Sequence, residues 1–278
     1  MKITPFSKNC GVTIEDVSLD KLSDDDFSQI KQAFIDHGLL FFRDQSLSPE
    51  QHKVFAKRFG DIVINKIFKQ LDGHPEIAVV SKDKKQVTNI GGGWHTDHSY
   101  DVEPAMASIL VARELPKSGG ATKFANMYAA YDGLSAGLKL TLSTITGMHS
   151  NHHLYGEGGY FNTTDLADKL AKNVQPSEAK HPVIIMHPES NKKVLYVNKA
   201  HTVGFENWHN EEAFTLLDYL YQHSTQAEYI CEFDWQPGSV AIWDNRCTWH
   251  YANNDYQGEI RTLHRITVAG SALSGVLL

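Results

Sequence analysis

Short runs of apolar residues, separated by turns that are rich in glycine and polar residues, recur along most of the chain. Apolar runs of about four to eight residues between such turns are typical of β-strands. We predict strands at the start of the segment 2–17 and at 39–42, 77–80, 106–112, 121–124, 182–186, 194–197, 229–233, 239–243 and 261–268. Many short strands indicate a sandwich or jelly roll, and therefore a mainly β fold with flanking helices.

Helical periodicity is confined to a few stretches. We predict helices at 23–38, 48–60, 126–134 and 210–223. Ser23 and Ser48 are suitable N-caps, and Gln51 completes a capping box with Ser48. Asn210 is the predicted N-cap of the last helix, which carries two glutamates in its first turn. We expect the first two helices to pack outside a sheet and to take no part in chemistry.

A chain of 278 residues is long enough for one large domain, so we predict a single domain over residues 1–278. The segment 135–180 has weak periodicity, which indicates a lid insertion or a surface excursion. The net charge of −7 and the short basic clusters argue against nucleic acid and anionic membranes as partners. The N-terminus lacks the apolar core of a signal peptide and no later run has the length of a membrane span, so a cytoplasmic location is expected.

The chain has three cysteines, Cys10, Cys231 and Cys247. Their number is odd and no two of them have C-x-x-C spacing, so the sequence indicates neither a disulfide framework nor a cysteine zinc site. Cys247 lies near His250 along the chain, and a buried structural thiol is favoured over a nucleophile at this position.

The stretch Gly91–Tyr100 holds the strongest candidate for metal chemistry. If residues 94–98 are extended, His95 and Asp97 point to the same face, because side chains alternate along a strand. Two histidines and one carboxylate on one face of a metal form the site of non-haem Fe(II) oxygenases, so a second imidazole is needed. His250 is the candidate. The competing interpretation of the H-x-D triplet alone is a polar strand edge.

Two arginines on one predicted strand point to an anionic ligand. Arg261 and Arg265 are four residues apart and share strand parity, with Leu263 between them on the same face. Guanidinium groups that point into a fold need anions to meet them. For Arg265 the competing interpretation is a structural salt bridge, since carboxylates are plentiful in this chain.

Several motifs along nearly the whole chain carry a resemblance to a known family. They are Phe55–Gly60, Trp94–Asp97, Glu114–Thr122, Ala129–Tyr131, Ala241–Arg246, His250–Asn253 and Leu263–Arg265. Through them the chain resembles the taurine dioxygenase and aryloxyalkanoate dioxygenase (TauD/TfdA) family of Fe(II)/2-oxoglutarate enzymes. The resemblance implies a double-stranded β-helix, a cupin-like jelly roll, with the iron inside its open end. It also implies a homo-oligomer, a dimer or a tetramer.

The resemblance implies roles for individual residues. His95, Asp97 and His250 match the iron ligands. Arg261 matches the arginine that pairs with the far carboxylate of 2-oxoglutarate, and Thr122 matches the hydroxyl that binds the same carboxylate. A fork-shaped guanidinium suits a planar carboxylate. The implied co-substrates are 2-oxoglutarate and O₂, and no catalytic side chain beyond the iron centre is implied.

The resemblance is less complete around the substrate. Arg265 matches a second arginine, which holds the substrate anion in the sulfonate-oxidising members of the family. Asn65 stands where taurine-oxidising members have a histidine that helps to bind the sulfonate, and His201 stands where they have an aromatic residue. The bulky His98 follows the aspartate of the H-x-D triplet. These departures argue against taurine itself, and the four residues are the candidates for substrate binding.

We therefore expect an Fe(II)- and 2-oxoglutarate-dependent dioxygenase that hydroxylates a small or medium organic anion: a sulfonate, a sulfate ester or a carboxylate. Succinate and CO₂ are released, and hydroxylation next to a heteroatom leads to C–S or C–O cleavage. The alternatives are an aryloxyalkanoate-type ether-cleaving dioxygenase and a non-catalytic jelly-roll binding protein. A zinc hydrolase with the same three ligands is less favoured, because it leaves Arg261 and Thr122 without a purpose.

Overall fold

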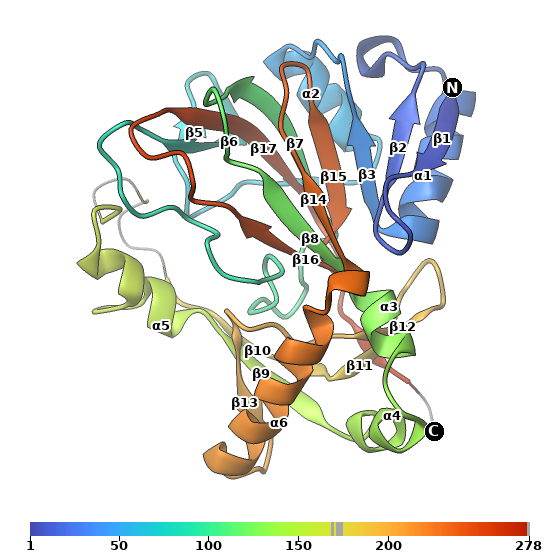
Figure 1. Cartoon of the computed structure of the whole chain (residues 1–278), viewed down its shortest axis with the longest axis vertical. Helices are drawn as coiled ribbons and strands as arrows, with labels where there is room; N and C mark the ends of the chain where they lie inside the picture. The colour runs from blue at the N-terminus through green and yellow to red at the C-terminus, as the bar shows by residue number, and fades with distance from the viewer. Residues whose placement is uncertain (168–169, 171–174, 277–278) are drawn as a thin grey trace.

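One sheet of nine strands forms the largest layer of the computed structural model, which describes residues 1–167, 170 and 175–276 (Figure 1). Along the sheet the strands follow the order β1 (Lys2–Pro5), β2 (Val12–Glu15), β3 (Leu39–Phe42), β15 (Val240–Asp244), β7 (Ala107–Glu114), β17 (Arg261–Val268), β6 (His74–Lys82) and β5 (Gln70–Leu71), and β4 (Ile62–Val63) also pairs with β17. The late strand β17 is therefore enclosed between β6 and β7.

A smaller sheet faces the inner side of the large one. It consists of β14 (Ile230–Phe233), β8 (Thr122–Asn126) and β16 (Thr248–Ala252). The apolar cluster between the two sheets includes Leu39, Phe41, Leu110, Phe124, Phe233, Ala241, Trp243 and Leu263. Two sheets packed face to face over such a core form a jelly roll, so the predicted mainly β fold with flanking helices is confirmed.

The alternation of side chains along each strand decides which residues face the smaller sheet. In β15, Trp243 belongs to the inner cluster, whereas its neighbour Ile242 belongs to the cluster on the outer side. In β17, Leu263 belongs to the inner cluster, and Arg261 and Arg265 share its parity. Both guanidinium groups are therefore carried on the face of the large sheet that looks inward.

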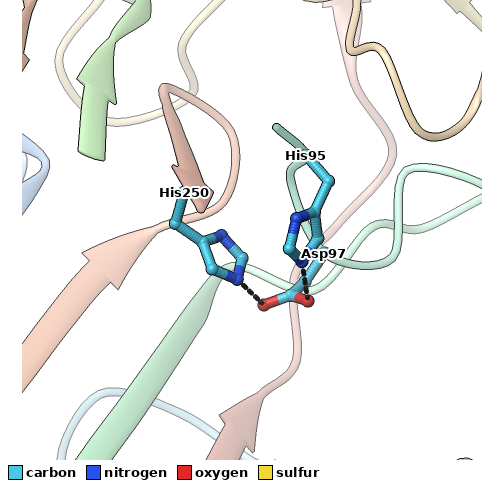
Figure 2. Close-up of side chains that lie close together, drawn as sticks. All are labelled: His95, Asp97 and His250. Carbon is cyan, nitrogen blue, oxygen red and sulfur yellow. Dashed lines mark ion pairs between the residues drawn. The ribbon is translucent and has the colours of Figure 1, made fainter. Parts of the chain in front are cut away.

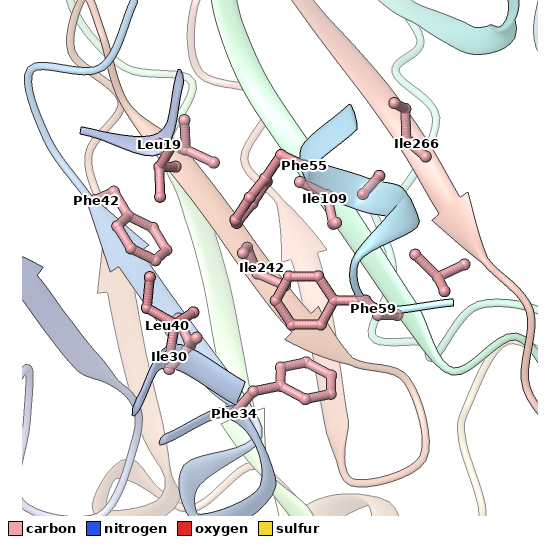
Figure 3. Close-up of a cluster of buried hydrophobic side chains, with 14 of the residues drawn as sticks. Leu19, Ile30, Phe34, Leu40, Phe42, Phe55, Phe59, Ile109, Ile242 and Ile266 are labelled. Atoms are coloured by element: carbon pink, nitrogen blue, oxygen red, sulfur yellow. The ribbon is translucent and has the colours of Figure 1, made fainter. Parts of the chain in front are cut away.

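Two helices cover the outer face of the large sheet. They are α1 (Asp24–His37) and α2 (Pro49–Lys57), and each presents one apolar stripe to the strands. Figure 3 shows Phe34 of α1 and Phe55 of α2 packed with Ile242 and other buried side chains of the sheet. These helices stabilise the barrel wall and contribute no group to the inner face.

The remaining elements lie mostly at the opposite end of the molecule (Figure 1). They are the helices α3 (Met127–Asp132), α4 (Ala136–Leu142), α5 (His152–Tyr155) and α6 (Asn210–Ser224), the 3₁₀ turns η2 (Tyr160–Thr163) and η3 (Ala227–Tyr229), the sheet of β10 (Glu178–Pro182), β9 (Thr146–Ser150) and β13 (Thr202–Phe205), and the sheet of β12 (Lys193–Leu195), β11 (Ile184–Met186) and β18 (Ser274–Gly275). The 3₁₀ turn η1 (Leu19–Lys21) instead packs with α1 and α2 on the outer face of the large sheet. A separate apolar cluster holds most of them together. Among the described residues no helix has the length and apolar character needed to cross a membrane.

The segment 135–180 is more ordered at its start than its weak periodicity suggested. Leu142 and Ile145 are buried in the apolar cluster beneath α6, so this part belongs to the packed body. Tyr155 and Phe161 lie further along, where the segment borders the surface depression described below. Residues 168–169 and 171–174 of the predicted insertion lie outside the described residues. The lid role and the single-domain boundary stay predictions.

Several element boundaries differ from the prediction. α2 ends at Lys57 rather than at Gly60. α6 has His209 rather than Asn210 as its N-cap, because the Glu212 carboxylate accepts a hydrogen bond from the His209 N–H at 3.2 Å. Several short strands were not predicted. Among them, β2 and β16 contain polar residues that break a continuous apolar run.

The buried histidine of α2 predicts a pH-dependent stability. His52 has no exposed surface, and burial, reinforced by Arg113, lowers its pKa to about 3. The unfolded chain binds a proton near pH 6.5 and the folded chain does not, so stability falls as the pH drops from about 6.5 towards 3. The free energy of unfolding of the wild type should fall between pH 7 and pH 5, and we expect His52→Leu to make that fall smaller by about 1–2 kcal/mol. Urea unfolding at the two pH values measures it. Between pH 7 and pH 8.5 the variant and the wild type should show the same pH dependence, and a difference there would contradict this origin.

Candidate metal centre

His95 and His250 face each other across a single β-bridge. The His95 N–H donates to the His250 carbonyl at 3.1 Å, and the His250 N–H donates to the His95 carbonyl at 2.8 Å. His250 lies in β16 directly opposite Phe124 of β8, so it shares with Phe124 the face that looks toward the large sheet. The fold therefore brings together two imidazoles that lie far apart in the sequence.

Asp97 reaches the same place from a turn, so the prediction that residues 94–98 are extended was wrong. Only His95 makes a β-bridge, a turn begins at Asp97, and His98 has a left-handed φ of 61°. That conformation is uncommon for a residue with a side chain. A hydrogen bond from the Asp101 N–H to the His98 carbonyl, at 3.0 Å, closes the turn and helps to hold it. The turn directs the Asp97 carboxylate at the two imidazoles (Figure 2).

The three side chains present converging ligand atoms. The Nε2 atom of His95 lies 3.8 Å from Oδ1 of Asp97, and Nε2 of His250 lies 3.8 Å from Oδ2 (Figure 2). An ion about 2.1 Å from each atom spans such a separation. Nδ1 of His95 is 2.7 Å from the Gly93 carbonyl, so Nδ1 carries the proton and Nε2 keeps its lone pair. Two imidazole nitrogens and a carboxylate oxygen on one face are a donor set that fits Fe(II).

Burial sets the charges of these groups. It lowers the pKa of His95 and holds that of His250 well below its ordinary value, so both imidazoles are neutral at neutral pH. Burial acts to raise the pKa of the Asp97 carboxyl, but the charge of Arg265 is the main influence in the opposite direction, and that pKa lies far below its usual range. Deprotonated ligands are what a divalent cation requires, so the site needs no rearrangement of protons to bind one.

Arg265 contacts the carboxylate of Asp97 directly. Its two terminal nitrogens lie 3.2 Å from Oδ1 and 2.9 Å from Oδ2, and the Ser108 hydroxyl donates to Oδ2 at 2.9 Å. Such outer partners fix the orientation of a metal ligand. The salt-bridge interpretation of Arg265 thus has a geometric basis, although its Nε has no hydrogen-bond partner among the described residues. Its predicted contact with a substrate anion stays a prediction.

Arg261 is buried without an acid partner. It is 5% exposed, and no carboxylate of the described residues lies within ion-pair distance of it. Its NH2 group donates to the Thr122 hydroxyl at 3.1 Å, and Nε1 of Trp235 donates to the same oxygen at 2.9 Å. Because Thr122 Oγ1 accepts both bonds, its own hydrogen is available to a further acceptor. Trp235 was missed by the sequence analysis, since a lone tryptophan between Asp234 and Gln236 carries no signal for this contact.

All the site residues that the sequence predicted line one cavity. They are Asn65, His95, Asp97, His98, Thr122, His201, His250, Arg261 and Arg265. The cavity adjoins a wider depression of about 630 Å³, with which it shares Ile90, Gly91, His95, Tyr155 and His201. The sequence analysis missed the apolar wall formed by Phe68, Ile90 and Tyr155, because these residues lie outside periodic segments.

The predicted substrate-binding residues beside Arg265 differ in their surroundings. The Asn65 side-chain oxygen accepts hydrogen bonds from two backbone N–H groups of its own loop, at 2.9 and 3.0 Å, so this oxygen is already engaged. Nδ1 of His98 lies 2.9 Å from an Asp101 carboxylate oxygen. His201 packs edge-on against Tyr100, with ring centroids 4.8 Å apart, and its Nδ1 has no partner within the described part of the chain. His201 is therefore the freest of the three to contact a ligand.

A second group of possible ligands lies apart from the cavity and is already neutralised. His187, Asp244 and Cys247 bring their ligand atoms together in the interior. The Asp244 carboxylate accepts hydrogen bonds from Nε and NH2 of Arg246, at 2.8 and 2.6 Å, and lies 3.0 Å from Nε2 of His187. Burial raises the pKa of the Cys247 thiol, which agrees with the predicted structural role. The Arg246 guanidinium thus neutralises the Asp244 carboxylate, as a metal ion bound there would do.

Residues 2–267 match the sequence profile of the Taurine catabolism dioxygenase TauD, TfdA family. The chain belongs to the TauD/TfdA family. The match covers both halves of the metal centre and both arginines of β17, so the resemblance seen in the sequence motifs is confirmed.

Relatives in this family match the chain over nearly its full length. It is 33% identical to an alkylsulfatase from Acinetobacter baylyi, over 99% of this chain and 87% of the relative. It is 30% identical to an (S)-phenoxypropionate/alpha-ketoglutarate-dioxygenase from Sphingobium herbicidovorans, over 99% and 97% of the two chains. A crystal structure of a taurine dioxygenase from Burkholderia xenovorans superimposes with a TM-score of 0.83 and 31% identity, over 99% and 92% of the chains. The double-stranded β-helix is thereby confirmed.

As a TauD/TfdA member, the protein is a 2-oxoglutarate-dependent non-haem iron dioxygenase that uses Fe(II), 2-oxoglutarate and O₂. The residues present fit this chemistry, because the neutral donor nitrogens and the ionised carboxylate converge on one point. Bound Fe(II) supplies the activation of O₂. The non-catalytic binding protein and the zinc hydrolase have no support from the family.

Proposed function

We propose that this dioxygenase hydroxylates a small or medium organic anion, a sulfate ester, a sulfonate or a carboxylate, with release of succinate and CO₂. The single observation that carries the proposal is Arg261, which is buried, has no carboxylate partner among the described residues, and lines the same cavity as the three proposed metal ligands. An uncompensated buried cation is costly, so the cavity is built to receive an anion at this position.

We assign the far carboxylate of 2-oxoglutarate to Arg261 and Thr122. The guanidinium fork supplies charge and two donors, and the Thr122 hydroxyl supplies its free hydrogen. Trp235 fixes the direction of that hydrogen by donating to the hydroxyl oxygen. His95, Asp97 and His250 hold the metal, and the co-substrate is thereby oriented between two fixed points of the inner face.

We assign the substrate anion to the other side of the cavity, near Arg265, Asn65, His98 and His201. Arg265 is the charged member of this group that faces Asp97. Its Nε has no hydrogen-bond partner among the residues that the structure describes, so Arg265 can keep one bond to Asp97 while it donates to a substrate oxygen. The apolar wall of Phe68, Ile90 and Tyr155 suits the carbon skeleton of the substrate. Exclusion of water by this wall protects the reacting carbon from side reactions.

An aryloxyalkanoate ether-cleaving activity remains the second candidate. The 30% identity to the phenoxypropionate dioxygenase, over nearly the whole of both chains, favours it. Both candidates place an anionic group on Arg265 and differ in the skeleton that fills the apolar wall. A panel of short alkyl sulfates, alkanesulfonates and 2-phenoxypropionate, scored by succinate release, separates them.

Arg265→Gln tests the substrate assignment. We expect KM for the preferred anion to rise about 10–100-fold, the cost of one or two charge-assisted hydrogen bonds, while the Kd of 2-oxoglutarate stays within about threefold. Steady-state kinetics and anaerobic 2-oxoglutarate binding are measured on the same preparation. Arg113→Gln, on the solvent side of β7, is the matched control and should change neither constant. An unchanged KM together with a weakened affinity for Fe(II) would show that Arg265 serves Asp97 alone.

Two predictions from the sequence concern the protein as a whole. A homo-oligomer, a dimer or a tetramer, is tested by light scattering coupled to size-exclusion chromatography. A cytoplasmic location is tested by fractionation of cells that produce the native chain.

A further inference from the structure

Two cysteines that the sequence left unpaired lie side by side in the interior. Cys10, in the loop between β1 and β2, and Cys231, in β14, are 2% and 6% exposed. Their Sγ atoms are 2.8 Å apart, although the residues are separated by 221 positions in the chain. Both are free cysteines in the structure. A disulfide bond is about 2.05 Å long, so less than 1 Å of movement separates the two sulfurs from bonding distance.

The loop that carries Cys10 is held against β8 and β14. The Ser7 hydroxyl accepts a hydrogen bond from the Cys10 N–H at 3.1 Å and donates to the Cys10 carbonyl at 3.0 Å. The Asn9 side chain donates to the Glu228 carbonyl at 3.0 Å, just before β14 begins. Gly11 has a φ of 74°, and a Cβ there would meet Leu39 and Phe41 at 3.0 Å, so the turn is also fixed on its other side.

Pairing between β14 and β8 holds Cys231 in place. It lies opposite Phe124 in the pairing of β14 with β8, and the Cys10 sulfur lies 3.6 Å from the Phe124 carbonyl. The contact with Cys10 and burial both raise the pKa of Cys231, so this thiol is protonated near neutral pH. Neither cysteine lines the cavity of the metal centre. The two thiols therefore have no role in the proposed dioxygenase site.

We propose that Cys10 and Cys231 are a site of reversible disulfide formation, with a low-molecular-weight disulfide such as oxidised glutathione as the oxidant. Local opening of the loop exposes Cys10, which loses its proton and attacks one sulfur of the small disulfide, releasing one small thiol. Cys231, deprotonated in turn, attacks the Cys10 sulfur of the mixed disulfide and releases the second small thiol. Two electrons pass from the cysteine pair to the oxidant, and the two protons end on the small thiols.

The crosslink ties the first hairpin of the chain to β14, near the C-terminal third. Because it closes a loop of more than two hundred residues, it restricts the unfolded chain strongly. We expect oxidation to raise Tm by about 5–10 °C. Cys247 has no part in it, because its sulfur contacts Asp244 and Thr248 and neither of the other cysteines.

The test uses the reduced full-length protein in glutathione buffers with an increasing share of the oxidised form, with and without about 2 M urea to permit local opening. Samples are quenched in acid, denatured, labelled with a maleimide and digested without reduction. Trypsin separates the three cysteines into peptides 9–21, 200–246 and 247–261. We expect the linked pair of 9–21 with 200–246, one labelled thiol per chain, and reversal by dithiothreitol.

The matched variants are Cys247→Ala and Cys231→Ala. The first should form the same linked peptide and show the same rise in Tm, and the second should show neither. Three labelled thiols per chain in the most oxidising buffer, or glutathione adducts without a linked peptide, would overturn the proposal even if both variants fail to fold.

Discussion

Asp97→Asn is expected to weaken Fe(II) binding at least about 100-fold and to reduce succinate formation at least about 1,000-fold. The change keeps the shape of the side chain but replaces the one anionic ligand by a neutral amide, and an outer partner of a ligand alone is worth 10–100-fold. It also leaves Arg265 facing an uncharged group, at 3.2 and 2.9 Å in the wild type. Anaerobic Fe(II) titration and a coupled succinate assay measure the two effects.

Asp101→Asn is the matched control for this prediction. Asp101 is close in sequence, its carboxylate lies 2.9 Å from Nδ1 of His98, and it is not among the converging ligand atoms. The control should bind Fe(II) within about threefold of the wild type. Equal loss in both variants would indicate a general disturbance of the turn, and full Fe(II) affinity in Asp97→Asn would remove Asp97 from the metal site.

Asp244→Asn is expected to destabilise the protein by about 3–5 kcal/mol, because it leaves Arg246 as a buried charge with a weakened partner. Asp244 is 0% exposed and Arg246 is 2% exposed. Burial acts to raise the pKa of Asp244, but Arg246 and His187 outweigh it, so the carboxylate is ionised in the folded state. Within the part of the chain that the structure describes, Glu189, at 2.8 Å, is the one charged partner that Arg246 keeps in the variant. Urea unfolding at pH 7.5 measures the difference.

Asp218→Asn on the exposed side of α6 serves as the control for a lost carboxylate and should change stability by less than about 0.5 kcal/mol. Replacing Arg246 by Met in the Asp244→Asn background should recover part of the loss, since the unpaired charge is then gone. A cost of less than about 1 kcal/mol for Asp244→Asn would contradict the buried-pair account.

The sequence predicted most accurately those features that depend on one strand or one helix alone. Alternation along β17 predicted correctly that Arg261, Leu263 and Arg265 share one face, because that relation depends on parity alone. Ser23 and Gly38 marked both ends of α1, since capping is a local property. The same locality explains why the H-x-D triplet could be singled out as a candidate, although residues 94–98 are not extended as that argument assumed.

The sequence was least informative about contacts between distant segments. Whether Arg265 faces Asp97 or only solvent depends on how β17 sits beside the turn at residue 97, which no local pattern encodes. The approach of Cys10 to Cys231 depends in the same way on the packing of the β1–β2 loop against β14. Such contacts follow from tertiary packing, and neither propensity nor spacing contains them.

The most direct test of the central claim is an anaerobic titration of the Fe(II) protein with 2-oxoglutarate, in wild type and in Arg261→Ala. We expect a weak visible charge-transfer band in the wild type. In the variant the same band should need at least about 10–100-fold more 2-oxoglutarate, because the far carboxylate loses its charged partner. Absence of the band in a folded, Fe(II)-loaded wild-type protein, or equal affinity in both proteins, would contradict the assignment of His95, Asp97, His250 and Arg261 to one catalytic site.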